Sequence, residues 1–374
     1  MTKKILFLTG TRADFGKIKS LIQTLEAASN FDVFVFVTGM HLQEVYGYTL
    51  LEIERCGFEN VYTFENHTHE STMDLTLAKT ISGLSPYVKE CQPDMIVIHG
   101  DRVEALAGAI VGSLNNILVA HIEGGEVSGT IDELIRHATS KMSHVHFVSN
   151  THAAKRLQQM GELEQSVFTI GSPDLDIMFS DNLPNLETAK RYYEIDFETY
   201  AVAMFHPVTT EAIDMQQYAD DFVAALLEDT HNYVVVYPNN DLGSNVILTA
   251  YEKIKNHPRF RIFPSLRFEY FLILLKKSQF IIGNSSAGIR EAPYYGLPII
   301  NIGTRQQNRA LNADIINVDY SKSSIQSALA YIDTHKVKPT SNDFGQGNSA
   351  ELFLKSLIAN DIWQLNHQKQ FRDI

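Results

Sequence analysis

Short runs of β-branched and aromatic residues recur along the whole chain, and segments of helical length separate them. The runs are apolar at consecutive positions, which is typical of parallel strands buried on both faces of a sheet. The segments between them, such as Asp14–Ser29 and Tyr270–Ser278, carry apolar residues at helical spacing. The predicted strands are Lys4–Thr9, Val33–Thr38, Met95–His99, Leu118–Ile122, Val145–Ser149 and Val167–Ile170 in the first half, and Tyr200–Phe205, Tyr233–Tyr237, Arg261–Phe263, Phe280–Gly283, Ile299–Ile302 and Ile315–Val318 in the second.

This alternation of strands and helices predicts an α/β fold with doubly wound parallel sheets. The pattern runs twice and breaks between Gly171 and Thr199, in a stretch with several Pro, Ser, Asn and Asp residues. We therefore predict two Rossmann-like domains, residues 1–178 and 179–355, joined by a linker in that break. A helix is expected over Ala350–Leu365, and residues 356–374 are expected to pack back on the N-terminal domain.

Length and charge narrow the classes of function. The 374 residues fit two domains, since one domain commonly takes about 150 residues. With 44 acidic and 31 basic residues, the formal net charge is −13. Nucleic acids and anionic membranes select clustered basic surfaces, so the acidic balance argues against both as partners. An anionic ligand would have to be held by local groups against the overall field.

Cysteine content and hydropathy indicate the compartment. Cys56 and Cys91 are the only cysteines, and their spacing is not that of metal ligands, as expected in a reducing cytosol. The apolar run near the N-terminus is too short for the core of a secretory signal. No stretch approaches the roughly 18 apolar residues of a membrane span. We therefore predict a soluble cytoplasmic protein.

Polar residues gather where the predicted strands end. In doubly wound sheets, ligands bind outside the carboxyl ends of the strands. Because such ends occur in both halves of the chain, the pattern predicts one ligand cleft between the two domains. The strand ends concerned are Thr9-Gly-Thr-Arg-Ala-Asp14, His99-Gly-Asp-Arg102, His121-Ile-Glu-Gly-Gly-Glu126, His206-Pro-Val-Thr-Thr210, Gly283-Asn-Ser-Ser286 and Gly303-Thr-Arg305.

The stretch from Gly283 to Glu291 is the strongest phosphate-binding candidate. Ser285 and Ser286 are expected to begin a helix, whose first amides and positive dipole end favour a phosphate oxygen. The alternative is a capping serine without a ligand. The motifs of P-loop NTPases and of standard NAD-binding sites are absent from the sequence, which argues against both functions.

Three arginines, Arg12, Arg102 and Arg305, stand just past strand ends. Guanidinium groups at these positions are suited to clamp a diphosphate through paired hydrogen bonds. Taken alone, each arginine is better explained as a solvated or ion-paired surface residue. Because three arginines are expected at one cleft, we favour diphosphate binding over a surface role for them.

Asp101, Glu123 and Asp132 are the candidate acid–base groups. Carboxylates crowded into one cleft repel one another, which raises at least one pKa toward neutrality, as general acid–base catalysis requires. The alternative is helix capping, since Asp132 heads a helix expected over Ile131–Ser143, or salt bridges within loops.

Histidines offer a second kind of proton-transfer group. His206 follows the first strand of the second half, where a neutral imidazole is suited to handle a proton or hold a phosphate. The other histidines show no persuasive spacing of metal ligands, so no metal site is predicted. His144 and His146 are expected to be structural.

Several stretches, in order and over nearly the whole chain, resemble the hydrolysing UDP-N-acetylglucosamine 2-epimerases. The resemblance implies a glycosyltransferase-B fold, two Rossmann-like domains around a UDP-sugar cleft. It also implies conversion of UDP-N-acetylglucosamine and water to N-acetylmannosamine and UDP, the opening step of bacterial sialic acid synthesis, without a cofactor. A homodimer or homotetramer is implied too. The stretches are Thr11-Arg-Ala-Asp-Phe-Gly-Lys17, His99-Gly-Asp-Arg-Val-Glu-Ala-Leu106, His121-Ile-Glu-Gly-Gly-Glu-Val-Ser-Gly-Thr-Ile-Asp132, Ile135-Arg-His137, His206-Pro-Val-Thr-Thr210, Pro238-Asn-Asn-Asp-Leu-Gly243, Gly283-Asn-Ser-Ser-Ala-Gly-Ile-Arg-Glu291 and Gly303-Thr-Arg-Gln306.

The resemblance also implies roles for single residues. Acid–base chemistry falls to Asp101, Glu123 and Asp132, with His206 handling a proton or contacting phosphate. The resemblance does not say which carboxylate abstracts a proton and which donates one. The implied UDP-binding residues are Ser285 and Ser286 at the β-phosphate, Glu291 at the ribose, Arg12, Arg102 and Arg305 near the diphosphate, and Asn239.

Other activities of the same fold stay open at this point. A hydrolysing epimerase of UDP-N,N′-diacetylbacillosamine would carry the same motifs and serve legionaminic acid synthesis. A non-hydrolysing 2-epimerase would return UDP-N-acetylmannosamine, but those enzymes lack the Glu-Gly-Gly-Glu-x-Ser-Gly-Thr stretch seen here from Glu123 to Thr130. A retaining glycosyltransferase would need an acceptor groove that nothing marks. A catalytically silent sensor is disfavoured by the intact carboxylates.

Overall fold

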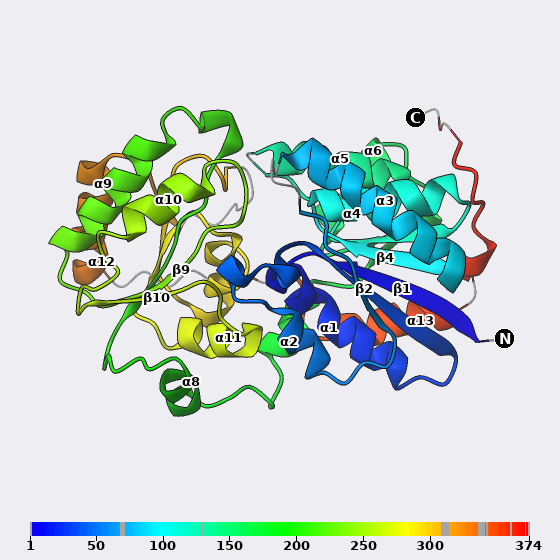
Figure 1. Cartoon of the computed structure of the whole chain (residues 1–374), viewed down its shortest axis with the longest axis horizontal. Coiled ribbons are helices and arrows are strands. Elements are labelled where there is room, and N and C mark those ends of the chain that lie inside the picture. Colours follow the sequence, from blue (N-terminus) through cyan, green and yellow to red (C-terminus); the bar gives the residue numbers. More distant parts are fainter. Residues whose placement is uncertain are drawn as a thin grey trace. The chain divides into compact units, whose positions relative to one another are not determined.

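Parallel strand pairing organises the chain in its computed structural model, which describes residues 2–67, 72–128, 130–307, 314–335, 341, 343–359, 361–370 and 372. The chain divides into two units. Each unit contains one sheet whose described strand pairs are all parallel, with helices on its faces (Figure 1). The predicted α/β architecture with two doubly wound sheets is thus confirmed. Unit 1 comprises Met1–Glu126, Asp132–Ser180 and Asp343–Ile374, and unit 2 comprises Val127–Ile131 and Asp181–Asn342.

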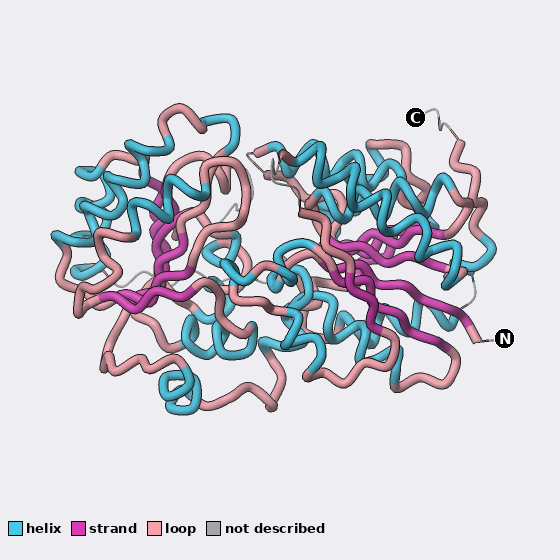
Figure 2. Tube along the Cα trace, viewed as in Figure 1, coloured by secondary structure: helices cyan, strands magenta, loops and turns pink. Residues whose placement is uncertain are grey.

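The sheet of unit 1 has the strand order β3-β2-β1-β4-β5-β6-β7, and its strands run side by side in Figure 2. The order reverses between β1 and β4, and ligands of such sheets bind in the crevice outside the carboxyl ends at that reversal. The strands are β1 (Lys3–Thr9), β2 (Phe31–Val37), β3 (Val61–Thr63), β4 (Met95–His99), β5 (Leu118–Ile122), β6 (Val145–Val148) and β7 (Val167–Thr169).

The sheet of unit 2 repeats the same winding, with the order β10-β9-β8-β11-β12-β13. Its reversal lies between β8 and β11, so the loops after these two strands occupy the equivalent crevice. The strands are β8 (Ala201–Met204), β9 (Tyr233–Val236), β10 (Phe260–Phe263), β11 (Ile281–Gly283), β12 (Ile299–Ile302) and β13 (Ile316–Val318).

The apolar runs form strands because both of their faces are covered. In β1, Ile5 and Phe7 point into one core, whereas Leu6 and Leu8 point into another, as the two-residue period of a strand requires. In unit 1, α1 and α13 pack on the first face, and α3 and α4 pack on the second (Figure 1). In unit 2, α9, α10 and α12 share one core with the sheet.

The α-helices fill the connections between the strands. In unit 1 they are α1 (Arg12–Glu26), α2 (Leu50–Glu54), α3 (Met73–Cys91), α4 (Val103–Leu114), α5 (Ile131–Met142), α6 (Thr151–Gln159), α7 (Asp174–Met178) and α13 (Ser349–Ile358). In unit 2 they are α8 (Leu186–Tyr192), α9 (Met215–Glu228), α10 (Ser244–Tyr251), α11 (Phe268–Lys276) and α12 (Lys322–Thr334). Three-residue and four-residue turns of 3₁₀ helix, labelled η, occur between them.

The end of the chain returns to unit 1. Phe353 of α13 is fully buried, and its ring packs edge-on against Phe147 of β6 with the ring centroids 4.7 Å apart. The expectation that residues up to 355 stay with the second domain therefore differs from the structure, in which Asp343–Ile374 belong to unit 1. The physical reason is that α13 buries its apolar face on the N-terminal sheet.

Two local features depart from the predicted elements. β3 was not predicted, because its three residues are only half-buried or exposed and too few to show a strand pattern. The predicted helix at the end of the chain is interrupted, with α13 ending at Ile358 and a 3₁₀ turn, η7, over Asp361–Gln364. All of the predicted strands are present, and their ends shift by at most two residues.

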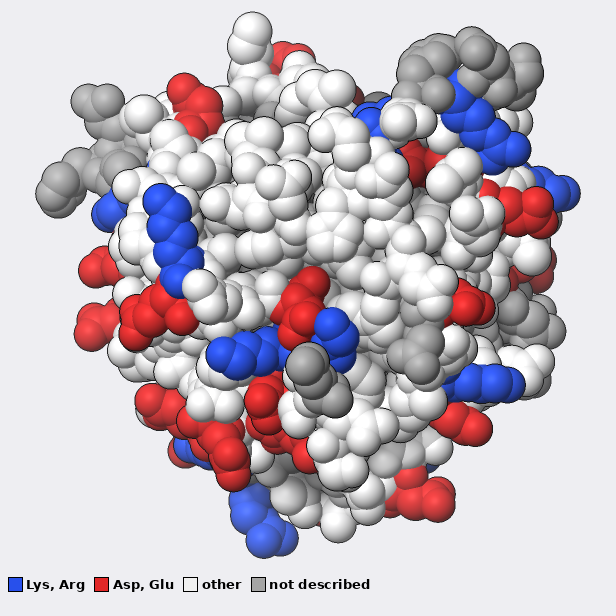
Figure 3. All heavy atoms as spheres, turned by 90° about the vertical axis from the view of Figure 1, so that its right-hand side faces the viewer, with Lys and Arg blue, Asp and Glu red and all other residues white. Residues whose placement is uncertain are grey.

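The helices and the charged surface can be compared with the prediction that neither membranes nor nucleic acids are partners. Among the described residues, none of the helices combines the length and the apolar character needed to cross a membrane. On the face shown in Figure 3, acidic and basic side chains lie in small mixed groups. The described residues of that face therefore do not form the continuous basic surface that nucleic acid selects.

Candidate active site

The loop after β1 is built by hydrogen bonds from its own residues. The Thr11 hydroxyl caps α1 by accepting from the Asp14 amide, and the Thr11 amide donates to Oδ1 of Asp14, so the pair forms a capping box. Burial raises the pKa of the Asp14 carboxyl, although a hydrogen bond from the Gly10 amide opposes the rise. Arg12 begins α1, and its Nη2 lies 3.5 Å from Oε1 of Glu52. The predicted diphosphate ligand Arg12 is thus partly engaged by a carboxylate.

The loop after β4 presents Asp101 and Arg102. Arg136 of α5 donates a hydrogen bond from Nη2 to Oδ2 of Asp101. Nε of Arg102 lies 3.6 Å from Oε2 of the buried Glu104, at the start of α4. Both predicted residues therefore stand at the carboxyl end of β4, as expected.

Arg136 joins two of the predicted carboxylate positions. Its guanidinium is only 3 % exposed, and Nη1 donates to the backbone carbonyl of Glu123 at 2.6 Å while Nη2 holds Asp101. A buried guanidinium that donates to a carboxylate forms a charge-assisted hydrogen bond, which fixes the direction of the carboxylate. The sequence stretch around Ile135 contained Arg136, but nothing local distinguished it from an exposed helix arginine.

Glu123 is the most enclosed of the predicted carboxylates. It follows β5 with φ of 63°, in the left-handed region, and is 3 % exposed. Its Oε2 lies 3.0 Å from Nε2 of His99, Ser172 donates to Oε1, and Nζ of Lys17 lies 3.7 Å from Oε1. Both oxygens of Glu123 are therefore held in place by partners from different elements.

Asp132 lies on the first turn of α5, four residues before Arg136. Residues four apart face the same side of a helix, so Asp132 shares the side that reaches Asp101. The structure thereby brings Asp101 and Glu123 together through Arg136 and adds Asp132 on the same helix.

His121 supports this loop from inside the fold. Its Nε2 lies 2.7 Å from the carbonyl of Gly100, and its Nδ1 lies 2.9 Å from the hydroxyl of Ser140. Burial lowers the pKa of His121 to about 3, so the ring is neutral at physiological pH. A carbonyl only accepts, so Nε2 carries the proton and Nδ1 accepts from Ser140. His121 is therefore a structural support for the residue before Asp101.

In unit 2, the loops after β8, β9 and β11 meet at His206. The His206 amide donates to Oδ1 of Asn284 at 2.6 Å, and Nδ2 of Asn284 donates back to the His206 carbonyl at 2.8 Å. The Asn239 amide donates to Nδ1 of His206 at 3.0 Å. Nδ1 is thus the acceptor nitrogen, so Nε2 of the neutral ring carries the proton and is the donor. Asn284 was not assigned a role from the sequence, although it lies in the Gly283–Glu291 stretch.

The predicted phosphate loop has a different backbone from the one expected. A 3₁₀ turn, η5 (Ser286–Gly288), follows β11 in place of an α-helix, and a second turn, η6 (Ala292–Tyr295), contains Pro293. Proline lacks the amide hydrogen needed to continue a helix, so the segment breaks into turns. Ser285 accepts a hydrogen bond from the Ala287 amide at 3.3 Å. The capping role considered for Ser285 is therefore present, and phosphate binding stays a prediction.

Gly283 allows the two strands at the reversal to approach. Its φ is +133°, and a Cβ at this position would lie 1.9 Å from the carbonyl oxygen of Met204. Any larger residue would force β8 and β11 apart. This glycine therefore determines where the loop that carries Ser285 and Ser286 begins.

Arg305 supports the same loop through its backbone. Nη1 of Arg305 donates to the Asn284 carbonyl at 3.2 Å, and Nε2 of Gln306 donates to the same oxygen at 2.9 Å. The side chains of Arg290 and Glu291 are both 4 % exposed. Arg305, implied at the diphosphate, thus contacts the Gly283–Glu291 stretch, and Glu291, implied at the ribose, is buried within that stretch.

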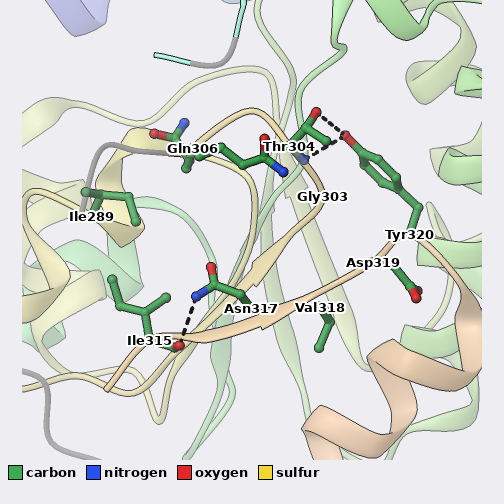
Figure 4. Close-up of a pocket in the computed structure, with 10 residues that line it drawn as sticks. Ile289, Gly303, Thr304, Gln306, Ile315, Asn317, Val318, Asp319 and Tyr320 are labelled. Atoms are coloured by element: carbon green, nitrogen blue, oxygen red, sulfur yellow. Dashed lines mark hydrogen bonds between the residues drawn. The ribbon is translucent and has the colours of Figure 1, made fainter. Parts of the chain in front are cut away.

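A hollow of about 470 Å³ borders the Gly303–Gln306 segment (Figure 4). In Figure 4, the Tyr320 hydroxyl points toward Thr304, whose amide donates to it at 3.2 Å. The Thr304 hydroxyl in turn donates to Oε1 of Glu211 at 2.6 Å. These contacts fix the segment that carries Arg305. That the site residues of the two units face one cleft stays a prediction.

Comparison with known proteins places this chain among nucleotide-sugar enzymes. A family model described as UDP-N-acetylglucosamine 2-epimerase matches residues 23–358. The chain is 46% identical to a UDP-N-acetylglucosamine 2-epimerase of Neisseria meningitidis serogroup B, over 100% of this chain and 99% of that protein. It is 34% identical to the UDP-N,N′-diacetylbacillosamine 2-epimerase (hydrolyzing) of Legionella pneumophila, over 94% of both chains. A solved UDP-GlcNAc 2-epimerase from Neisseria meningitidis, bound to UDP-GlcNAc, shares the fold with a TM-score of 0.80 at 20% identity, covering 96% of this chain and 100% of that one.

Proposed function

Because the chain belongs to the UDP-N-acetylglucosamine 2-epimerase family, we propose that it is a hydrolysing UDP-N-acetylglucosamine 2-epimerase. The proposed reaction converts UDP-N-acetylglucosamine and water to N-acetylmannosamine and UDP. The product would supply sialic acid synthesis. The reaction balances with water alone, so no redox cofactor takes part in the proposal.

One observation supports this proposal above the others. Arg136 binds the carboxylate of Asp101, after β4, and the backbone carbonyl of Glu123, after the neighbouring β5, so both residues lie at the carboxyl edge of the unit 1 sheet. Inversion at a sugar carbon needs one group that takes a proton from one face and another that returns it on the opposite face. A set of carboxylates held by different elements is suited to this task.

The chemistry proceeds by elimination followed by hydration. The C2–H of the sugar is not adjacent to a carbonyl, so its proton is released only as the C1–O bond to the diphosphate breaks. The electron pair of the C1–O bond leaves with UDP, and the pair of the C2–H bond forms the C1=C2 double bond of 2-acetamidoglucal. The proton goes to a carboxylate of the acid–base set. The water oxygen then forms a bond to C1 and the water gives up one proton to a carboxylate of the set, while the electron pair of the C1=C2 bond takes a proton at C2 from another acid of the set, on the opposite face.

The leaving diphosphate needs donors, which unit 2 carries. In the proposal, Nε2–H of His206 donates to a phosphate oxygen, because Nδ1 is occupied by the Asn239 amide. Ser285 and Ser286 hold the β-phosphate and Glu291 holds the ribose hydroxyls. Hydrogen-bond donors that are already in place before the reaction stabilise the developing negative charge without having to reorganise. This electrostatic stabilisation is usually the largest single contribution to the rate enhancement of an enzyme.

Hydrolysis, as opposed to return of a UDP-linked sugar, is proposed from two features. The stretch from Glu123 to Thr130 resembles that of hydrolysing enzymes. The Legionella relative, at 34% identity, carries the word hydrolyzing in its name. That relative acts on the diacetylbacillosamine nucleotide, so this donor is the second candidate, and it differs from the first at C4 and C6 of the sugar.

Proton NMR of the purified protein with UDP-N-acetylglucosamine in D₂O tests the proposal. We expect free UDP and free N-acetylmannosamine that carries deuterium at C2. A UDP-linked product would contradict the hydrolysing claim. Turnover of the diacetylbacillosamine nucleotide alone would establish the second candidate. Light scattering on the same sample tests the proposed homodimer or homotetramer.

A further inference from the structure

Lys17 is a buried cation at the centre of unit 1. It lies on α1, its residue is 8 % exposed, and its Nζ lies 2.8 Å from Oδ2 of Asp174 and 3.7 Å from Oε1 of Glu123. Asp174 is 1 % exposed and Glu123 is 3 % exposed. Burying an ammonium group is costly unless it is paired, so these carboxylates account for a lysine at this position.

The two carboxylates are placed differently. Asp174 is the first residue of α7 and makes the shorter contact, so it anchors the ammonium. Glu123 is the residue after β5, at the carboxyl edge of the sheet, where ligands of this fold bind. The longer contact therefore brings the charge of Lys17 near a carboxylate of the proposed acid–base set.

The ammonium of Lys17 lies near two buried carboxylates and not in one isolated pair. Asp174 makes the shorter contact, and Glu123 adds a second carboxylate near the same ammonium. Each of these buried groups loses its hydration, so each depends on the others for stabilisation. Interacting buried charges of this kind are common at catalytic sites.

We propose that Lys17 is a positioning residue for Glu123, whose carboxylate it keeps ionised and oriented while Asp174 anchors the ammonium. This inference rests on the proposed function, in which Glu123 belongs to the acid–base set. Ser172 and His99 hold the same carboxylate from the loop before α7 and from β4. Contacts from three elements thus fix both oxygens of Glu123.

The groups that face Glu123 determine how its protonation responds to a change in charge. They are Lys17 on α1, His99 on β4, Arg136 on α5, which binds the Glu123 carbonyl, and Asp174 on α7 through Lys17. Replacing Lys17 and Asp174 together with neutral residues leaves His99 and Arg136 in place. Such a double variant therefore isolates the effect of the Lys17 charge on Glu123.

The test is the double variant Lys17→Met/Asp174→Asn, which avoids leaving Asp174 charged and buried. An opposite charge within about 4–6 Å moves a carboxyl pKa by about one to three units. We therefore expect the acid limb of the kcat profile to move up by about that much, so that kcat falls most at acid pH. The affinity for UDP should stay within about threefold, because neither Lys17 nor Asp174 is among the residues assigned to UDP. Lys19→Met, on the same helix, is the matched control and should leave both unchanged.

A second measurement does not depend on turnover. The side-chain carboxyl of Glu123 is followed by NMR in protein labelled with ¹³C at the glutamate carboxyls, with Glu123→Gln to assign the signal. We expect its titration midpoint to rise in the double variant relative to the wild type. An unchanged midpoint would overturn the inference. If the midpoint rises but the wild type does not turn over UDP-N-acetylglucosamine, the proposed function fails and the role of Lys17 stands.

Discussion

Arg136 donates a hydrogen bond to the carboxylate of Asp101, which ties the second turn of α5 to the end of β4. The same guanidinium donates to the Glu123 carbonyl at 2.6 Å, so one side chain connects three segments of unit 1. Arg136 itself is buried, with only 3 % of the residue exposed. The position of the proposed acid–base set therefore depends on a cation that has no chemistry of its own in the reaction.

Replacing Arg136 should impair both stability and turnover. In Arg136→Met, Asp101 loses a charged partner, and removing one member of a buried pair costs about 3–5 kcal/mol. We expect a fall in kcat of about 10²-fold or more, as for loss of a fixed electrostatic group. Thermal unfolding and steady-state kinetics measure the two effects. Arg136→Lys keeps the charge with fewer donors and should be intermediate, and wild-type kcat in Arg136→Met would refute the role.

Neutral replacements of the carboxylates should separate catalysis from binding. Asp101→Asn and Glu123→Gln keep the shape but cannot carry a proton, so kcat should fall by about 10²–10⁴-fold. The affinity for UDP, measured by calorimetry, should stay close to that of the wild type. Glu133→Gln on α5 is the matched control, since its side chain is 35% exposed, and it should change little. Near-normal turnover in both Asp101→Asn and Glu123→Gln would remove these residues from the acid–base set.

The assigned tautomer of His206 makes a specific prediction. His206→Asn can still accept from the Asn239 amide but has no group where Nε2–H stood, whereas His206→Gln can place an amide N–H near that point. We expect the Asn variant to lose about tenfold or more in UDP affinity, since a hydrogen bond to a charged group contributes about 1.5–3 kcal/mol. The Gln variant should lose less. Equal losses in the two variants would contradict the assignment of Nε2–H as the donor.

Glu162 should control stability in acid. Burial alone would raise its pKa, but the hydrogen bond and charge of His146 together with the charge of Lys369 lower the pKa to about 2, from an ordinary 4.5. The unfolded chain then takes up the proton first as pH falls. The stabilisation is therefore complete above about pH 5 and is lost as pH falls toward 2, and it is on the order of 3 kcal/mol.

Denaturant unfolding of Glu162→Gln against wild type at several pH values measures this effect. The difference in the free energy of unfolding should be large at pH 7 and shrink below pH 4. Glu164→Gln, two residues away and exposed, should show no such dependence. A difference between Glu162→Gln and wild type that stays constant with pH would rule out the linkage.

Much of the fold was predictable from local pattern. Parallel strands buried on both faces read as continuous apolar runs, and every predicted strand is present. β3 escaped prediction because only one of its residues, Val61, is even half-buried. The turn after Gly283 was expected to be a helix, because serines after glycine favour a helix start, but Pro293 and the close strand contact at Gly283 decide otherwise.

The candidate site was predictable as a set of strand ends. Asp101, Glu123 and His206 could be named because each follows an apolar run, and the reversal of strand order then determines which ends are neighbours. Arg136 and Asn284 could not be singled out. Their importance comes from burial and from partners on other elements, which no local pattern encodes.

The α/β class, the polar residues at the strand ends and the family could all be predicted from the sequence, because each depends on residues adjacent in the chain. Which charges pair follows only from the folded structure. Lys17 meets Asp174 across 157 positions, Arg136 reaches Asp101 across 35, and α13 returns to the N-terminal sheet. These pairings follow from the spatial order of the strands in each sheet, and from the free-energy cost of burying a charged group without a partner. Neither constraint is expressed in the spacing of residues along the chain.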